Sequence, residues 1–117
     1  AAAPANFTKV YADGENAYSI AAPHYNIPWS ERGGKSELIN RIVVQEDITN
    51  GQAVKAFDIY FYPDWYQDRK LLLYRGATIG HKAICHIPAT HASKITLEIT
   101  QADGEAVISD IKAYYVK

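Results

Sequence analysis

Alternation of apolar and polar residues constrains this chain more than any other sequence feature. Residues 95–100 give the clearest run, because Ile95, Leu97 and Ile99 alternate with threonine and glutamate, and residues 54–62 repeat the pattern. A period of two with β-branched and aromatic residues is typical of β-strands. No stretch has an apolar face of helical period. We therefore predict strands over 7–11, 18–21, 38–44, 54–62, 71–74, 83–87, 95–99 and 111–115.

Turn-forming residues separate most of these runs. They are Thr49-Asn50-Gly51, Pro63-Asp64, Arg75-Gly76, Pro88-Ala89 and Asp103-Gly104. Short strands joined by such turns favour an all-β antiparallel sandwich or barrel. We expect one domain over residues 7–117, preceded by a linker or trimmed end at 1–6.

Composition narrows the class of protein further. Disorder is excluded, because 12% of the 117 residues are aromatic and the net charge is only −1. Near-neutrality also argues against nucleic acid as a partner, and no apolar run reaches the ~20 residues that cross a membrane. Neither a signal peptide nor a methionine is present, so we expect a processed product or a piece of a longer protein. Cys85 is the single cysteine, which excludes an internal disulfide, and its place among core positions predicts an inert thiol.

Strand alternation divides the loops between two ends of the sandwich. The loops at 46–53, 75–82 and 101–106 are predicted at one end, and those at 63–70 and 88–94 at the other. Glu46 and Asp47 are the one adjacent pair of carboxylates at the first end, but neighbouring strand residues point to opposite faces, so they do not form a catalytic pair. Two roles stay open for Glu46: accepting backbone N–H groups around Thr49 to Gly51, or binding a ligand.

Three separated motifs carry a family resemblance. They are residues 40–48 with Gly51-Gln52-Ala53-Val54, residues 76–82 (Gly-Ala-Thr-Ile-Gly-His-Lys), and residues 95–99 followed by Ile108-Ser109-Asp110-Ile111. In order and spacing, residues 38–116 resemble the C-terminal β-sandwich domain of retaining α-L-fucosidases.

The resemblance implies a galactose-binding-like jelly-roll β-sandwich, related to discoidin and coagulation-factor type C domains. It implies a parent enzyme whose catalytic barrel lies outside this chain, and an extracellular, periplasmic or lysosomal-type compartment. We therefore expect no catalytic residue and no cofactor here. A structural calcium at the turn Asp13-Gly14-Glu15-Asn16 stays open, although this turn lacks a full calcium-loop pattern.

The resemblance also points to candidate site residues. Sugar binding needs an aromatic face and a few fixed polar groups; the candidates are His24 and Trp29 in the early loop with Glu46 and Asn50 in the 46–53 loop. Trp29 could instead cover the core, and His24 could be a solvated loop residue. His81 is predicted to contact another domain, or else to be a solvated turn histidine.

Trp65 and Tyr66 form an exposed aromatic surface or fold back over the sandwich. No metal site is predicted, because histidines 24, 81, 86 and 91 lack zinc-ligand spacing.

Four functions compete at this point. The chain is an accessory domain packed against a catalytic domain, a module that brings the enzyme to fucosylated glycans, a stand-alone lectin for fucosylated or galactosylated glycans, or a small enzyme. The near-neutral charge and the lack of arginine in the 46–53 loop favour the first function, and the aromatic loops favour the second. The expected partners are the catalytic domain and a glycan, with no nucleic acid and no membrane.

Overall fold

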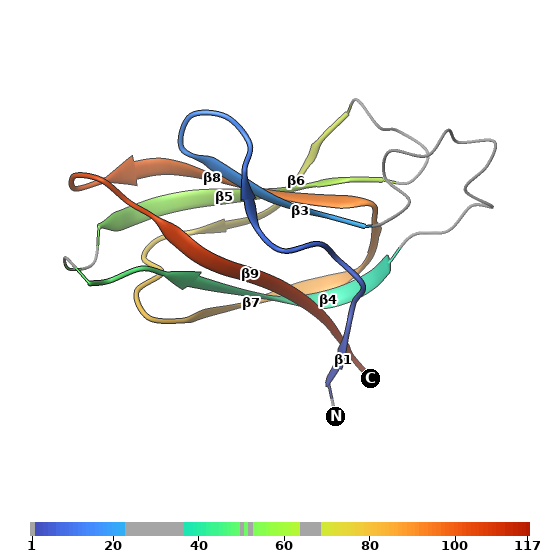
Figure 1. The fold of residues 1–117 in the computed structure, drawn as a ribbon. Helices are drawn as coiled ribbons and strands as arrows, with labels where there is room; N and C mark the ends of the chain where they lie inside the picture. Colours follow the sequence, from blue (N-terminus) through green and yellow to red (C-terminus); the bar gives the residue numbers. More distant parts are fainter. Residues whose placement is uncertain (1, 23–36, 50, 52, 64–68) are drawn as a thin grey trace.

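Two antiparallel sheets pack face to face in the computed structural model, which describes residues 2–22, 37–49, 51, 53–63 and 69–117 (Figure 1). The four-stranded sheet has the order β1 (Ala2–Pro4), β9 (Ile108–Val116), β4 (Glu37–Glu46) and β7 (Ala83–Ala92). The five-stranded sheet has the order β2 (Tyr11–Ala12), β3 (Ala17–Ala21), β8 (Lys94–Ala102), β5 (Val54–Tyr62) and β6 (Leu71–Gly76). The predicted β-sandwich is confirmed, and its jelly-roll connectivity stays a prediction. Within the described ranges, no helix has the length and hydropathy to cross a membrane.

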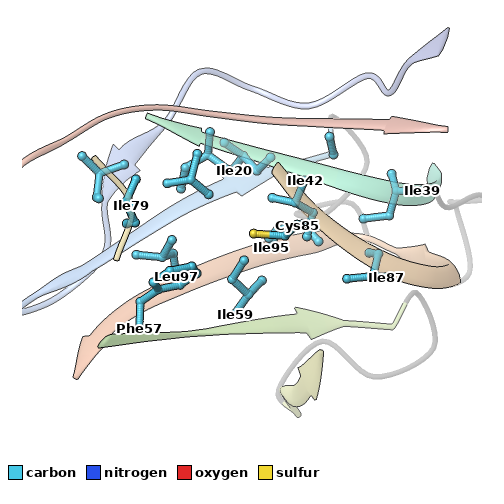
Figure 2. Close-up of a cluster of buried hydrophobic side chains, with 14 of the residues drawn as sticks. Ile20, Ile39, Ile42, Phe57, Ile59, Ile79, Cys85, Ile87, Ile95 and Leu97 are labelled. Atoms are coloured by element: carbon cyan, nitrogen blue, oxygen red, sulfur yellow. The ribbon is translucent and has the colours of Figure 1, made fainter. Parts of the chain in front are cut away.

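The core lies between the sheets, where alternate residues of the central strands meet (Figure 2). Ile95 and Leu97 of β8 are fully buried, as is Ile59 of β5, so the alternation seen in the sequence identified the inner face correctly. Cys85 is buried in the same cluster. Burial raises the pKa of its thiol to about 11, which keeps the group protonated and unreactive at neutral pH.

The N-terminal prediction was wrong in two places. Residues 2–4, expected in a linker, form β1 and extend the four-stranded sheet beside β9. The predicted strand 7–11 is reduced to Tyr11–Ala12. Thr8 instead bonds to the backbone of Ala21, because its N–H donates to Ala21 O (2.9 Å) and its hydroxyl accepts from Ala21 N (3.0 Å). Both segments lie at sheet edges, where pairing depends on the partner that the edge offers rather than on local alternation.

The predicted turn at Pro88-Ala89 is a bulge inside β7. The partners of β7 jump from Ile39↔Thr90 to Arg41↔His86, so the strand carries extra residues around Pro88. Proline has no N–H to give to a ladder and is therefore tolerated at such irregularities. β7 continues to Ala92, and the chain reverses at Ser93. Gly76, also expected in a turn, is the last residue of β6.

Candidate carbohydrate-binding site

Three loops meet at one end of the sandwich, which we call the 46–53 end. Asp103 N–H donates to Ala53 O and Asp47 N–H donates to Val107 O, both at 2.8 Å. Glu46 N–H donates to Gly80 O at 3.1 Å. The loops after β4, β6 and β8 therefore come together on the left in Figure 1, which confirms the predicted grouping.

The Glu46 carboxylate holds this end together. Glu46 is only 3% exposed. One carboxylate oxygen, Oε2, accepts hydrogen bonds from Ala53 N (2.7 Å) and Val54 N (3.1 Å). The other oxygen, Oε1, accepts from Gly80 N (3.2 Å). Ala53 and Val54 lie a few residues beyond the range 49–51 expected from the sequence, and Gly80 belongs to the 75–82 loop. Since both oxygens serve backbone donors of two different loops, Glu46 acts on the shape of this end.

An open hollow of about 400 Å³ lies beside this network. Its described lining comprises Asp47, Gly51, Ala53, Asp103, Gly104, Glu105 and Val107. The Thr49 hydroxyl (2.6 Å) and N–H (3.0 Å) both donate to Asp47 Oδ1 and lower the pKa of that carboxyl. Three carboxylates therefore offer acceptors for hydroxyl groups. None of the described lining residues is aromatic.

The early loop is the segment between β3 and β4 that contains His24 and Trp29. It begins and ends at the opposite end of the sandwich. Ala22 N–H donates to Ser93 O (2.7 Å), Ser93 N–H donates to Tyr62 O (2.8 Å), and Glu37 pairs with Ala92. β4 then runs its ten residues from Glu37 to Glu46, a distance of about 30 Å at ~3.3 Å per residue. The two loops predicted to build one sugar site therefore leave the sheets at opposite ends.

Several candidate residues lie outside the described ranges. His24, Trp29, Asn50, Trp65 and Tyr66 are among them, so their roles stay predictions. The described candidate His81 is exposed and follows Gly80 at the 46–53 end. Ile48 and Val107, each 41% exposed, belong to loops that meet there as well. An inter-domain role of His81 stays a prediction.

In the turn after β2, the acidic side chain of Asp13 is held by two other residues of the protein. Asp13 Oδ2 accepts from Ser19 Oγ (2.7 Å) and pairs with Lys94 Nζ (2.8 Å). Lys94 and Ser19 lower the pKa of the Asp13 carboxyl. Among the described residues, no group of three histidine, cysteine or acidic side chains could hold a metal ion.

Sequence reasoning missed a second hollow on the outer face of the four-stranded sheet. It measures about 340 Å³ and is lined by Arg41, Val43, Lys82, Ile84, His86 and Tyr114. Most of these residues alternate with core positions in the predicted strands, and this alternation indicates that they lie on the outer face. Alternation gives the face of each residue, and the register between strands was needed to bring them together.

Sequence comparison alone gives no relative: no family model and no curated protein matches the chain. Solved structures do match. A predicted α-L-fucosidase from Bacteroides ovatus is 27% identical with a TM-score of 0.70, over 95% of this chain and 16% of that one. A family 29 glycoside hydrolase fucosidase from Ruminococcus gnavus, in complex with fucose, is 24% identical with a TM-score of 0.65, over 94% and 20%.

A much shorter protein also matches. A chitosan-binding module of a chitosanase/glucanase from Paenibacillus is 16% identical with a TM-score of 0.59, over 90% of this chain and 73% of the module. The chain thus spans about a fifth of the fucosidases but most of the binding module. It has the fold of a small domain that occurs within α-L-fucosidase structures, which confirms the resemblance found in the sequence.

Proposed function

We propose that this chain is a non-catalytic accessory domain of a fucosidase-type glycoside hydrolase, which packs against the catalytic domain and contacts carbohydrate. The observation that carries the proposal is the extent of the structural match, about a fifth of each fucosidase against nearly three quarters of a chitosan-binding module. The same likeness favours an extracellular, periplasmic or lysosomal-type compartment.

The geometry of the adjacent carboxylates Glu46 and Asp47 supports a role without catalysis for this pair. Retaining glycoside hydrolysis needs two carboxyl groups about 5–5.5 Å apart that flank the bond. Glu46 is buried with its oxygens on backbone donors, so it is not available to a substrate. Asp47 is exposed and bound to Thr49, on the opposite side of the strand end.

The hollow beside Glu46 is the proposed carbohydrate contact at this end. Asp47, Asp103 and Glu105 would accept hydrogen bonds from sugar hydroxyls, and Asn50 would add an amide. Trp29 and His24 are proposed as a separate contact, because the early loop leaves the sheets at the other end. Glu46 would position the first contact without touching sugar.

A hydrolysis assay and a glycan array test the proposal together. The purified chain should not cleave a nitrophenyl fucoside, and measurable turnover that co-purifies with the protein would overturn the non-catalytic role. On an array with fucosylated and galactosylated ligands side by side, we expect binding that weakens severalfold in Asp103→Asn and separately in Trp29→Ala. Lys117→Gln, at the exposed chain end, is the control. No binding to any neutral glycan would reduce the proposal to packing alone.

A stand-alone lectin is the second candidate, favoured by the 73% coverage of the chitosan-binding module. Co-expression with the catalytic domain of a family 29 fucosidase separates the two. A complex that survives gel filtration supports the accessory domain, and a monomer that binds glycan unaided supports the lectin.

A further inference from the structure

The outer face of β9, β4 and β7 carries a cationic hollow that the proposed function does not use. These three strands lie side by side in the four-stranded sheet (Figure 1). The register places Arg41 directly between Tyr114 and His86, and Val43 directly opposite Ile84. Cross-strand neighbours lie about 5 Å apart and alternate residues along a strand about 7 Å apart. The resulting surface has the breadth of one or two sugar residues and stands on a rigid sheet.

Its charge is positive and largely uncompensated. Among the described lining residues none is acidic, while Arg41 and Lys82 are cationic. Within the described part of the chain, the Arg41 guanidinium donates one hydrogen bond, to Asn40 O at 2.9 Å, and Lys82 is exposed without an ion pair. Asp110, on the neighbouring strand β9, instead pairs with Lys112 at 3.5 Å. A guanidinium fork with free N–H donors matches the oxygens of a carboxylate or a sulfate.

Its floor is apolar and small. Ile84 is 52% exposed, while Val43 and Tyr114 are half-buried. Ile84 is the one large exposed apolar residue on this face of the described chain, so the face lacks the continuous apolar area of a protein interface, which buries about 800 Å² on each partner. An aliphatic and aromatic floor with a charged rim instead suits a sugar, whose C–H groups rest on such surfaces.

We propose that this hollow binds an acidic sugar residue, with its carboxylate or sulfate held by Arg41 and Lys82 and its C–H face resting on Ile84 and Tyr114. The choice of a saccharide rests on the proposed carbohydrate-contacting function. The residues involved are separate from the 46–53 end and from the early loop.

Isothermal titration of the 117-residue chain tests the site with four probes of similar length. They are a heparin-derived oligosaccharide, an oligogalacturonate, a neutral galacto-oligosaccharide and an oligoglutamate peptide. We expect at least one acidic saccharide to bind, with an affinity that falls as salt is raised. Which of the two binds identifies sulfate or carboxylate as the recognised group. Chemical-shift changes in NMR should centre on Val43, Ile84 and Tyr114.

Charge-neutralising variants locate the binding. Arg41→Gln and Lys82→Gln should each weaken acidic-saccharide binding by about tenfold, since each removes a charge-assisted contact. Lys55→Gln is the matched control, because it removes the same charge from the five-stranded sheet. Lys82 is exposed, so its variant is informative even if Arg41→Gln is destabilised.

Three results would overturn the inference. They are acidic saccharides binding no better than the neutral one, equal losses in Lys55→Gln and Lys82→Gln, and tighter binding of oligoglutamate, which would indicate an acidic protein surface as occupant. If neutral fucosylated glycans still bind in any of these cases, the proposed function stands and this site alone fails.

Discussion

A single buried carboxylate fixes the shape of the 46–53 end. Glu46 accepts three backbone hydrogen bonds, from the loop that follows it and from Gly80 on a loop 34 residues further along the chain. A buried backbone N–H that loses its acceptor destabilises a protein by about 1–3 kcal/mol. Side-chain chemistry at this one residue therefore links two loops that share no strand pairing.

Glu46→Gln tests that link. The amide places an NH₂ group against backbone N–H donors, so we expect the free energy of unfolding to fall by about 2–3 kcal/mol in urea denaturation. Asp47→Asn, at the neighbouring exposed position, should change it by less than about 0.5 kcal/mol. Similar losses in both variants would contradict the structural role of Glu46.

The lowered pKa of Asp13 predicts how the stability of the fold depends on pH. Lys94 and Ser19 lower the pKa of its carboxyl from 3.8. A carboxyl with a depressed folded-state pKa stabilises the fold above its unfolded pKa, and loses this contribution as the pH falls below about 3.8 towards the folded value. Unfolding free energies of wild type should therefore fall more steeply below pH 4 than those of Asp13→Asn. A residual slope is expected from Asp47, whose pKa is lowered too. Identical slopes in the two proteins would exclude a contribution from Asp13.

Strands at the centre of a sheet were predictable from the sequence, as was β6 at one edge, but the edge segments near the N-terminus were not. β5 was predicted with its observed limits, and the prediction for β8 covers 95–99 of Lys94–Ala102, because a central strand places alternate residues in the core and the residue alternation records this. β1 and the segment 7–11 were wrong, because an edge strand pairs according to the backbone groups that its neighbour leaves open. β7 was cut short at Pro88, where the sequence gives the same signal for a bulge as for a turn.

The candidate site was predictable where it depends on strand direction, and not where it depends on pairing between strands. The meeting of the 46–53 and 75–82 loops follows from strand direction alone, and it was predicted correctly. The end at which the early loop leaves the sheets depends on the pairing of β3 with β8, which alternation does not encode. The cationic hollow needed the register of Arg41 against two other strands, which is information between strands rather than along one.

Gly76 in the last position of β6 shows a constraint between two strands. It lies directly opposite Phe57, and a Cβ built on it would sit 2.6 Å from Cε1 of the Phe57 ring. The ring covers the glycine, which is a way in which sheets compensate a missing side chain. This packing gives a physical reason for glycine at the start of the motif 76–82.

Gly76→Ala should therefore destabilise the protein by about 1–3 kcal/mol, through the displaced ring. The loss should largely disappear in a Phe57→Leu background, in a double-mutant cycle measured by chemical denaturation. Gly104→Ala is the control: its Cβ would meet open space, so any loss comes from its positive φ of 89° and should be the same in both backgrounds. An undiminished Gly76→Ala loss beside leucine would show that the ring is not the cause.

At the scale of the whole molecule, the two sheets are held together by the apolar core without a disulfide. Cys85 lies in that core on β7, and Tyr74 on β6 of the other sheet packs against the same cluster. Its thiol therefore reports whether the sheets stay together.

Alkylation of Cys85 by iodoacetamide near pH 8 measures this directly. Since burial raises the thiol pKa to about 11, native protein should react at least about 100-fold more slowly than protein unfolded in urea. The slow rate should rise with denaturant as global unfolding becomes accessible. Rapid labelling of the native protein would mean that the sandwich opens locally at β7.

The pairing of β1 with β9 has a mechanical consequence. Ala2 lies opposite Val116 in a three-residue antiparallel ladder, so the two chain ends emerge side by side (Figure 1). Tension applied across these ends would load the ladder's hydrogen bonds one after another rather than together. Under such a pull the molecule would unzip from this corner at low force, and β9 would be peeled from β4 before the rest of the sandwich bears any strain.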